Sequence, residues 1–153
     1  MAHRGRRCRR MVKDMLKGIS PLIAPELLML LSEMGHGEEI LLADANFPAG
    51  KFCSKVIQLP GADIPALLAA VMPLWTLDYK TQPFYMPAGS NGCDNRELAK
   101  LYLDIINRSN CDVPGMEFLS GEEFYTRAGR VRVCVVTGER RRFANLIIRK
   151  GVL

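Results

Sequence analysis

The sequence lacks the long apolar segments and the cysteine pairs that mark several special classes of protein. No apolar run approaches the roughly 18 residues of a membrane span, and no apolar segment follows the basic N-terminus as it would in a secretory signal. The five cysteines are odd in number, widely scattered and never in a C-x-x-C pair, which predicts reduced thiols rather than disulfides or a zinc knuckle. These absences favour a cytoplasmic protein without a membrane partner.

The common cofactor and catalytic motifs are also missing. There is no phosphate-binding G-x-x-x-x-G-K-[ST] loop and no G-x-S-x-G serine motif. The stretch "GHGEEI" at residues 35–40 lacks the third glycine and the preceding strand of a dinucleotide fingerprint. A zinc site would need more ligands than unpaired cysteines and one histidine outside the first three residues supply. The sequence therefore predicts neither a metal nor an organic cofactor.

The positive charge of the chain is confined to its first residues. The net charge of +5 is carried by residues 1–14, an arginine-rich arm, while the rest of the chain balances to zero. Such an arm could bind nucleic-acid phosphates, be a solvated tail, or precede a true start at Met15. Because residues 15–153 show no basic stripe interleaved with aromatics, we do not expect a nucleic-acid partner. Those residues fit one domain of ordinary globular composition.

Hydrophobic periodicity predicts helices that alternate with strands. Helices are expected over residues 20–35, 62–72 (ending before Pro73), 94–109 and 120–129. Strands are expected over residues 39–45, 116–120, 131–138 and 144–153, with short extended pieces around 77–80 and 84–86. Pro25 suits the first turn of the first helix, and Asp63 and Ser120 suit N-caps, the latter with Glu123 at capping-box spacing. This alternation predicts a single layered α/β domain with helices on both faces of a central sheet.

Two residues near the first predicted strand are candidates for chemistry. His36 lies between two glycines just before the strand, where the backbone can turn and leave the imidazole uncrowded. An imidazole exchanges protons near neutral pH, which suits a general acid or base; alternatively, His36 only hydrogen-bonds a nearby carbonyl. Asp44 ends an apolar strand, so its carboxylate must be paired, hydrogen-bonded or exposed to a cavity. Its alternative role is to cap the following loop.

Four segments together resemble the fucose mutarotase and ribose pyranase family of sugar mutarotases, and are closer to its fucose branch. They are "LKGISPLIAPELLMLLSEMGHGEEILLADANFP", "PLWTLDYK", "FYTRA" and "VVTGERRRFANLIIRKGV", in a match that runs from residue 15 nearly to residue 153. The resemblance implies a mainly parallel sheet and a cofactor-independent enzyme that interconverts the α and β anomers of free L-fucose or D-ribose. It also implies a homo-oligomeric ring, commonly a pentamer or stacked decamer, with sites between subunits.

The same resemblance assigns roles to individual residues. His36 matches the family's proton donor, and Tyr125 matches its second catalytic candidate. The implied substrate-binding residues are Asp44, Asp78, Met86, Phe143 and Asn145, the last two in the family's Tyr-x-Asn motif.

Two positions depart from the family's pattern. Phe143 stands where members usually have tyrosine, which removes one hydroxyl from the pocket. Gly121 stands where fucose-type members often have arginine, which removes a fork of donors suited to sugar hydroxyls. The reaction type is therefore better supported than the sugar, which could be another deoxy-sugar or a pentose. A ribose pyranase activity and a sugar-binding protein without turnover stay open as alternatives.

Overall fold

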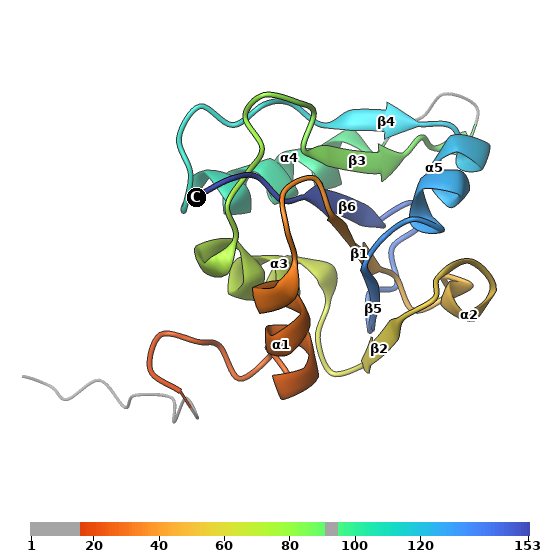
Figure 1. The fold of residues 1–153 in the computed structure, drawn as a ribbon. Helices are drawn as coiled ribbons and strands as arrows, with labels where there is room; N and C mark the ends of the chain where they lie inside the picture. The colour runs from red at the N-terminus through yellow and green to blue at the C-terminus, as the bar shows by residue number, and fades with distance from the viewer. Residues whose placement is uncertain (1–15, 91–94) are drawn as a thin grey trace, which may run out of the picture.

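The computed structural model describes residues 16–90 and 95–153, in which a central sheet lies between two sets of helices (Figure 1). The basic arm predicted for residues 1–14 lies outside the described residues. The strands are β1 (Glu39–Ala43), β2 (Val56–Leu59), β3 (Phe84–Pro87), β4 (Glu117–Leu119), β5 (Val133–Thr137) and β6 (Leu146–Arg149). They form a six-stranded sheet in the order β2-β5-β1-β6-β3-β4.

Most neighbouring strands of the sheet are parallel. β1 and β2 both pair with β5 in parallel, and β3 pairs with β4 in parallel. β6 is antiparallel to β1 on one side and to β3 on the other, so within the described part of the chain it alone runs against its neighbours. The predicted α/β domain with a mainly parallel sheet is therefore confirmed.

Helices cover both faces of the sheet because the central strands bury both faces. Ile40 and Leu42 of β1 pack into a core with α1 (Pro25–Glu33), α3 (Ile64–Val71) and α4 (Arg96–Asn107). Leu41 and Ala43, which point the opposite way, pack with α2 (Ala49–Phe52) and α5 (Gly121–Ala128). This two-sided burial explains why β1 is apolar from Ile40 to Ala43 rather than alternating.

The predicted helix ends are largely observed. Pro25 lies in the first turn of α1, Asp63 caps α3 by accepting the Ala66 N–H at 2.9 Å, and Ser120 begins a capping box at α5. α3 ends at Val71 and continues as a short 3₁₀ helix, η1 (Met72–Leu74). None of the helices in the described ranges is long and apolar enough to cross a membrane.

Three short segments differ from the sequence-based expectation. The single turn α2 and the edge strand β2 were not predicted, because four residues are too few to show a period and a single turn forms only when tertiary contacts stabilise it. Residues 77–80, predicted as an extended piece, contribute one isolated bridge between Leu77 and Lys150.

Candidate functional site

A pocket of about 350 Å³ lies where β1 ends, and Asp44, the residue after that strand, forms part of its wall. Tyr125 on α5 and Phe143 and Asn145, just before β6, also line it. These are four of the seven site residues expected from the sequence. Gly121, the first residue of α5, lines the pocket as well.

Asp44 is held in the wall of this pocket by its neighbours. Its N–H donates to Asn145 Oδ1 at 2.7 Å, which ties the end of β1 to the start of β6. Asp44 Oδ1 accepts the Asn46 N–H at 2.9 Å, so its alternative role as a loop cap is observed together with its place in the pocket. Burial raises the pKa of Asp44, and the hydrogen bonds from Asn46 and Asn145 oppose that rise. The carboxylate is therefore positioned to accept a hydroxyl of a polar ligand.

Stacked aromatic rings fix the position of Tyr125. Its ring stacks on Phe52 of α2 with centroids 4.5 Å apart, and on Phe47 with centroids 5.8 Å apart. The residue nevertheless stays 39% exposed, and its hydroxyl has no partner within residues 16–90 and 95–153. Stacking thus holds the ring while its hydroxyl is free to meet a ligand.

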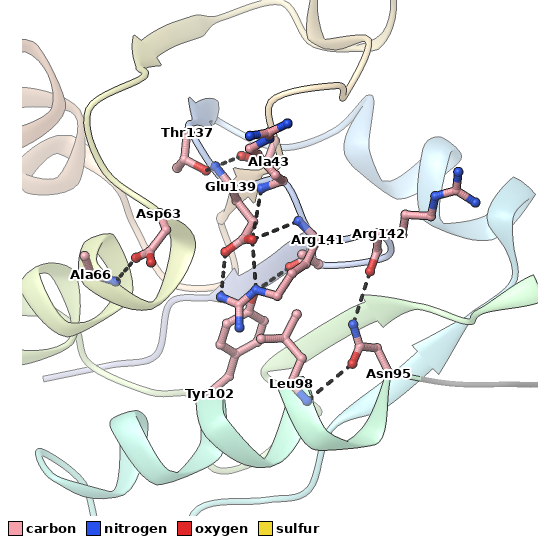
Figure 2. A network of polar contacts seen from close by, with 12 residues as sticks. Ala43, Asp63, Ala66, Asn95, Leu98, Tyr102, Thr137, Glu139, Arg141 and Arg142 are labelled. Atoms are coloured by element: carbon pink, nitrogen blue, oxygen red, sulfur yellow. Dashed lines mark hydrogen bonds and ion pairs between the residues drawn. The ribbon is translucent and has the colours of Figure 1, made fainter.

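Phe143 adopts a strained backbone conformation. Its φ of +55° lies in the left-handed region, which a large side chain rarely occupies. The flanking carbonyls are held from α4: Tyr102 donates its hydroxyl to the Ala144 oxygen at 2.8 Å, and Asn95, whose side chain caps α4, donates to the Arg142 oxygen at 3.1 Å (Figure 2). These bonds offset the strain and present the phenyl ring to the pocket.

A buried carboxylate organises the loop that precedes Phe143. Glu139 accepts two hydrogen bonds from the Arg141 guanidinium, from Nε at 2.9 Å and from Nη2 at 2.7 Å (Figure 2). This pairing lowers the pKa of Glu139 to about 2. Arg140, Arg141 and Arg142 all line the pocket, which sequence reasoning missed because "ERRRF" was interpreted only as a polar separator between two strands.

His36 and Asp78 form a second cluster. His36 Nε2 lies 3.2 Å from Asp78 Oδ2, and that oxygen also accepts a hydrogen bond from the Thr81 hydroxyl at 2.7 Å. The pKa of Asp78 is lowered to about 2, chiefly by the hydrogen bond from Thr81. Hydrogen bonds from the Lys80 N–H and from His36 lower it further. The Asp78 side chain is only 4% exposed, whereas that of His36 is 53% exposed. A buried carboxylate thus orients an exposed imidazole.

The turn that carries His36 requires one of its two glycines. Gly37 has a φ of +83°, and a Cβ there would lie 3.2 Å from the Arg149 guanidinium. Arg149 in turn places its Nε 3.5 Å from Asp78 Oδ2. Gly35 has no such conformation, and its N–H donates to the Glu38 carboxylate at 2.6 Å.

The structure of a single chain does not bring all the predicted site residues together. His36 precedes β1 and Asp44 follows it, so at about 3.3 Å per residue they are separated by on the order of 20 Å. Asp78 lies with His36, and Met86 is 0% exposed in the core rather than at the pocket wall. Within the described ranges, no group of three or more histidine, cysteine, aspartate or glutamate residues could hold a metal ion.

The chain is similar to known proteins over most of its length. The model of the RbsD / FucU transport protein family matches residues 17–153. An L-fucose mutarotase from Glaesserella parasuis is 43% identical over 141 residues, covering 90% of this chain and 96% of that protein. An L-fucose mutarotase from Haemophilus influenzae is 42% identical over 140 residues, covering 90% and 97%. The crystal structure of the fucose mutarotase from Streptococcus pneumoniae in complex with L-fucose superposes with a TM-score of 0.84 at 37% identity, covering 90% of this chain and 99% of that one.

Proposed function

The chain belongs to the RbsD / FucU family, as its sequence resemblance indicated, and we propose that it is a sugar mutarotase. It interconverts the α and β anomers of a free aldose, and L-fucose is the first substrate to test, because the relatives named above are L-fucose mutarotases. The observation that carries the proposal is a pocket that combines the Asp44 carboxylate, the Asn145 amide and the free Tyr125 hydroxyl.

The reaction needs only proton transfers. A base removes the proton of the anomeric hydroxyl while an acid protonates the ring oxygen, so the ring opens to the aldehyde without oxidation or reduction. Rotation about the bond between C1 and C2 exposes the other face of the carbonyl, and the reverse transfers reclose the ring. Groups held near both oxygens accelerate these steps because they replace bulk water as the proton carrier.

We assign the proton transfers to His36 and Tyr125. The Asp78 carboxylate fixes the orientation of the His36 ring, and the exposed part of that ring is available to a sugar. The stacked Tyr125 presents its hydroxyl at the pocket wall, and Asp44 and Asn145 beside it supply acceptors and donors for the remaining sugar hydroxyls. In this assignment Asp78 is a positioning residue rather than a sugar ligand.

The separation of His36 from the pocket supports a site formed between two copies of the chain, one of which supplies His36 and the other the pocket. One monosaccharide cannot contact both ends of β1, whereas the His36 cluster of one copy could meet the pocket of another. The two surfaces differ, so such a contact is heterologous, and repetition of it closes a ring. We therefore propose a homo-oligomeric ring, for which the family resemblance suggests a pentamer or decamer. We place it in the cytoplasm because the cysteines among residues 16–90 and 95–153, Cys53, Cys111 and Cys134, are all free thiols.

Magnetisation-transfer NMR of anomer exchange tests the proposal. The purified protein should accelerate exchange between the anomeric proton signals in at least one sugar of a set containing L-fucose, D-ribose, L-rhamnose and D-galactose. Fastest exchange with D-ribose would favour the ribose pyranase alternative. Saturable sugar binding without acceleration in any of them would contradict turnover and leave a binding protein.

A further inference from the structure

The segment at the end of β6, residues 149–151, pairs with the turn that carries His36. The backbone oxygen of Lys150 accepts the Gly37 N–H at 2.8 Å, and the Lys150 N–H donates to the Glu38 oxygen at 2.9 Å. Both bonds lie directly after His36 in the chain, between that residue and the start of β1. The backbone of Lys150 therefore fixes one side of the turn.

The side chain of Lys150 fixes the other side of the same turn. Its ammonium donates to the backbone oxygens of Met34 and of Leu31, the latter at 3.4 Å. These oxygens lie at the C-terminus of α1, where the carbonyls of a helix lack partners within the helix and form the negative end of its dipole. An ammonium group suits them because it is a cation that only donates hydrogen bonds. Lys150 thus holds the chain both before and after His36.

The same segment also contacts the chain around Asp78. Arg149 places its Nε 3.5 Å from Asp78 Oδ2. A Cβ on Gly151 would collide with the Leu77 oxygen, so the two backbones approach more closely than a side chain would allow. The segment that holds the His36 turn therefore also holds the residues that lead into Asp78.

This arrangement matters because the His36–Asp78 pair joins distant parts of the chain. His36 Nε2 and Asp78 Oδ2 lie 3.2 Å apart, although the two residues are 42 positions apart in the sequence. Because the His36 side chain is 53% exposed, its position depends on the backbone that carries it and on Asp78. The contacts of Lys150 lie within one chain, so they do not depend on what a second copy covers.

We propose that Lys150 is a positioning residue for His36, and that its ammonium, through the end of α1, sets where the imidazole lies relative to the Asp78 carboxylate. The inference rests on the proposed mutarotase function, in which His36 transfers a proton. In this role Lys150 contacts neither the sugar nor the reacting atoms. It acts only by holding the turn.

The His36 ring gives a readout of this geometry that does not require activity. With its pKa at about 2, Asp78 is ionised and can only accept a hydrogen bond, so His36 Nε2 donates and carries a proton. The sequence has two histidines, so selective 15N labelling of histidine gives few signals, and His36→Gln assigns those of His36. The 15N chemical shifts of its two ring nitrogens report whether Nε2 still donates to Asp78.

The test removes the ammonium and keeps an unbranched side chain. Lys150→Met should lower kcat for anomer exchange about tenfold or more, change KM less than about twofold, and shift the His36 15N signals, because a small displacement of a catalytic group is costly. Lys150→Arg keeps a cation with several donors, so it should retain at least about half of kcat and the wild-type signals. Lys100→Met, at an exposed position of α4, removes the same charge and should change neither.

Two kinds of result would overturn the inference. The first is a wild-type kcat, or unchanged His36 signals, in Lys150→Met. The second is a loss of kcat in Lys150→Arg as large as that in Lys150→Met, because the cation would then not be what holds the turn. If Lys150→Met does not fold, as circular dichroism would show, Lys150→Gln replaces it in the same comparison.

Failure of the inference can be distinguished from failure of the proposed function. Accelerated exchange in the wild type, with Lys150→Met equally active, would reject the inference and keep the mutarotase. If the wild type accelerates exchange of no sugar, the mutarotase is rejected, and the His36 signals of Lys150→Met still decide whether Lys150 positions the ring.

Discussion

At the scale of single residues, the chemistry depends on how weakly acidic and basic side chains are oriented. Asp78 is buried and hydrogen-bonded to Thr81, so it stays ionised and holds the His36 ring from one side. Tyr125 is held by ring stacking rather than by a hydrogen bond, which leaves its hydroxyl for the sugar. In both cases the group that we propose to be reactive is exposed, and a neighbouring side chain fixes its orientation.

The first prediction concerns His36 and its partner. His36→Gln should reduce anomer exchange by at least roughly 100-fold with sugar binding largely kept, because glutamine preserves hydrogen bonding but cannot cycle a proton near neutral pH. Asp78→Asn should give a smaller loss of kcat with KM unchanged, because the imidazole remains but loses its charged anchor. Exchange at the wild-type rate in His36→Gln would remove His36 from the mechanism.

The second prediction concerns Phe143. Phe143→Tyr keeps the ring and the strained backbone and adds a hydroxyl at the pocket wall. If that hydroxyl reaches the sugar, the new hydrogen bond contributes about 0.5 to 1.5 kcal/mol, which is roughly twofold to tenfold in affinity for L-fucose. Calorimetric titration of both forms measures it. An equal or poorer affinity in the tyrosine variant would mean that the pocket is built for a sugar other than L-fucose.

At the scale of elements, the site depends on the loop between β5 and β6. Glu139 anchors this loop through Arg141, and Tyr102 and Asn95 of α4 hold its later carbonyls. These contacts hold the backbone of Phe143 and of the three arginines before it in a fixed position.

The third prediction tests, through the pH dependence of stability, whether the Glu139–Arg141 ion pair stabilises this loop. The pKa of Glu139 is lowered to about 2 in the folded state, so its contribution to stability is present above the unfolded value near 4.5 and is lost as pH falls toward 2. Glu139→Gln should reduce the free energy of unfolding by about 1 to 3 kcal/mol at pH 7, a range that allows for the half-exposed Arg141. Urea unfolding at several pH values checks it. The difference in free energy of unfolding between wild type and variant should shrink below pH 4.5. A gap that stays constant down to pH 2 would contradict the ion pair.

Much at the element scale could be predicted from the sequence. The capping box at Ser120 and the apolar spacing of α4 depend on residues close in the chain, and the structure confirms both. α2 forms because Phe52 stacks on Tyr125, a contact between distant residues that no local pattern reveals. The arginines of the pocket were missed for a similar reason, because only the folded loop brings them beside Asp44.

At the scale of the whole molecule, the fold places the two halves of the proposed site at opposite ends of one central strand. The resemblance assigns catalytic roles to His36 and Tyr125, but a sequence alone does not show that His36 and the pocket lie at opposite ends of β1. The sheet makes this separation unavoidable, because β1 is buried between β5 and β6 and cannot bend to bring its ends together. Activity should therefore depend on assembly.

The last prediction uses that dependence. His36→Gln removes the acid/base group of one surface, and Tyr125→Phe removes only the hydroxyl of the other while keeping its stacking on Phe52. Each variant alone should form inactive rings. When the two are co-expressed in equal amounts, random assembly joins an intact His36 to an intact Tyr125 at about a quarter of the interfaces of a heterologous ring, so about a quarter of wild-type exchange should return. Rings of the two variants that are assembled separately and then mixed without subunit exchange contain no interface with both residues intact and serve as the control. If mixed rings form, as native mass spectrometry would show, but stay inactive, the site does not lie between copies of the chain.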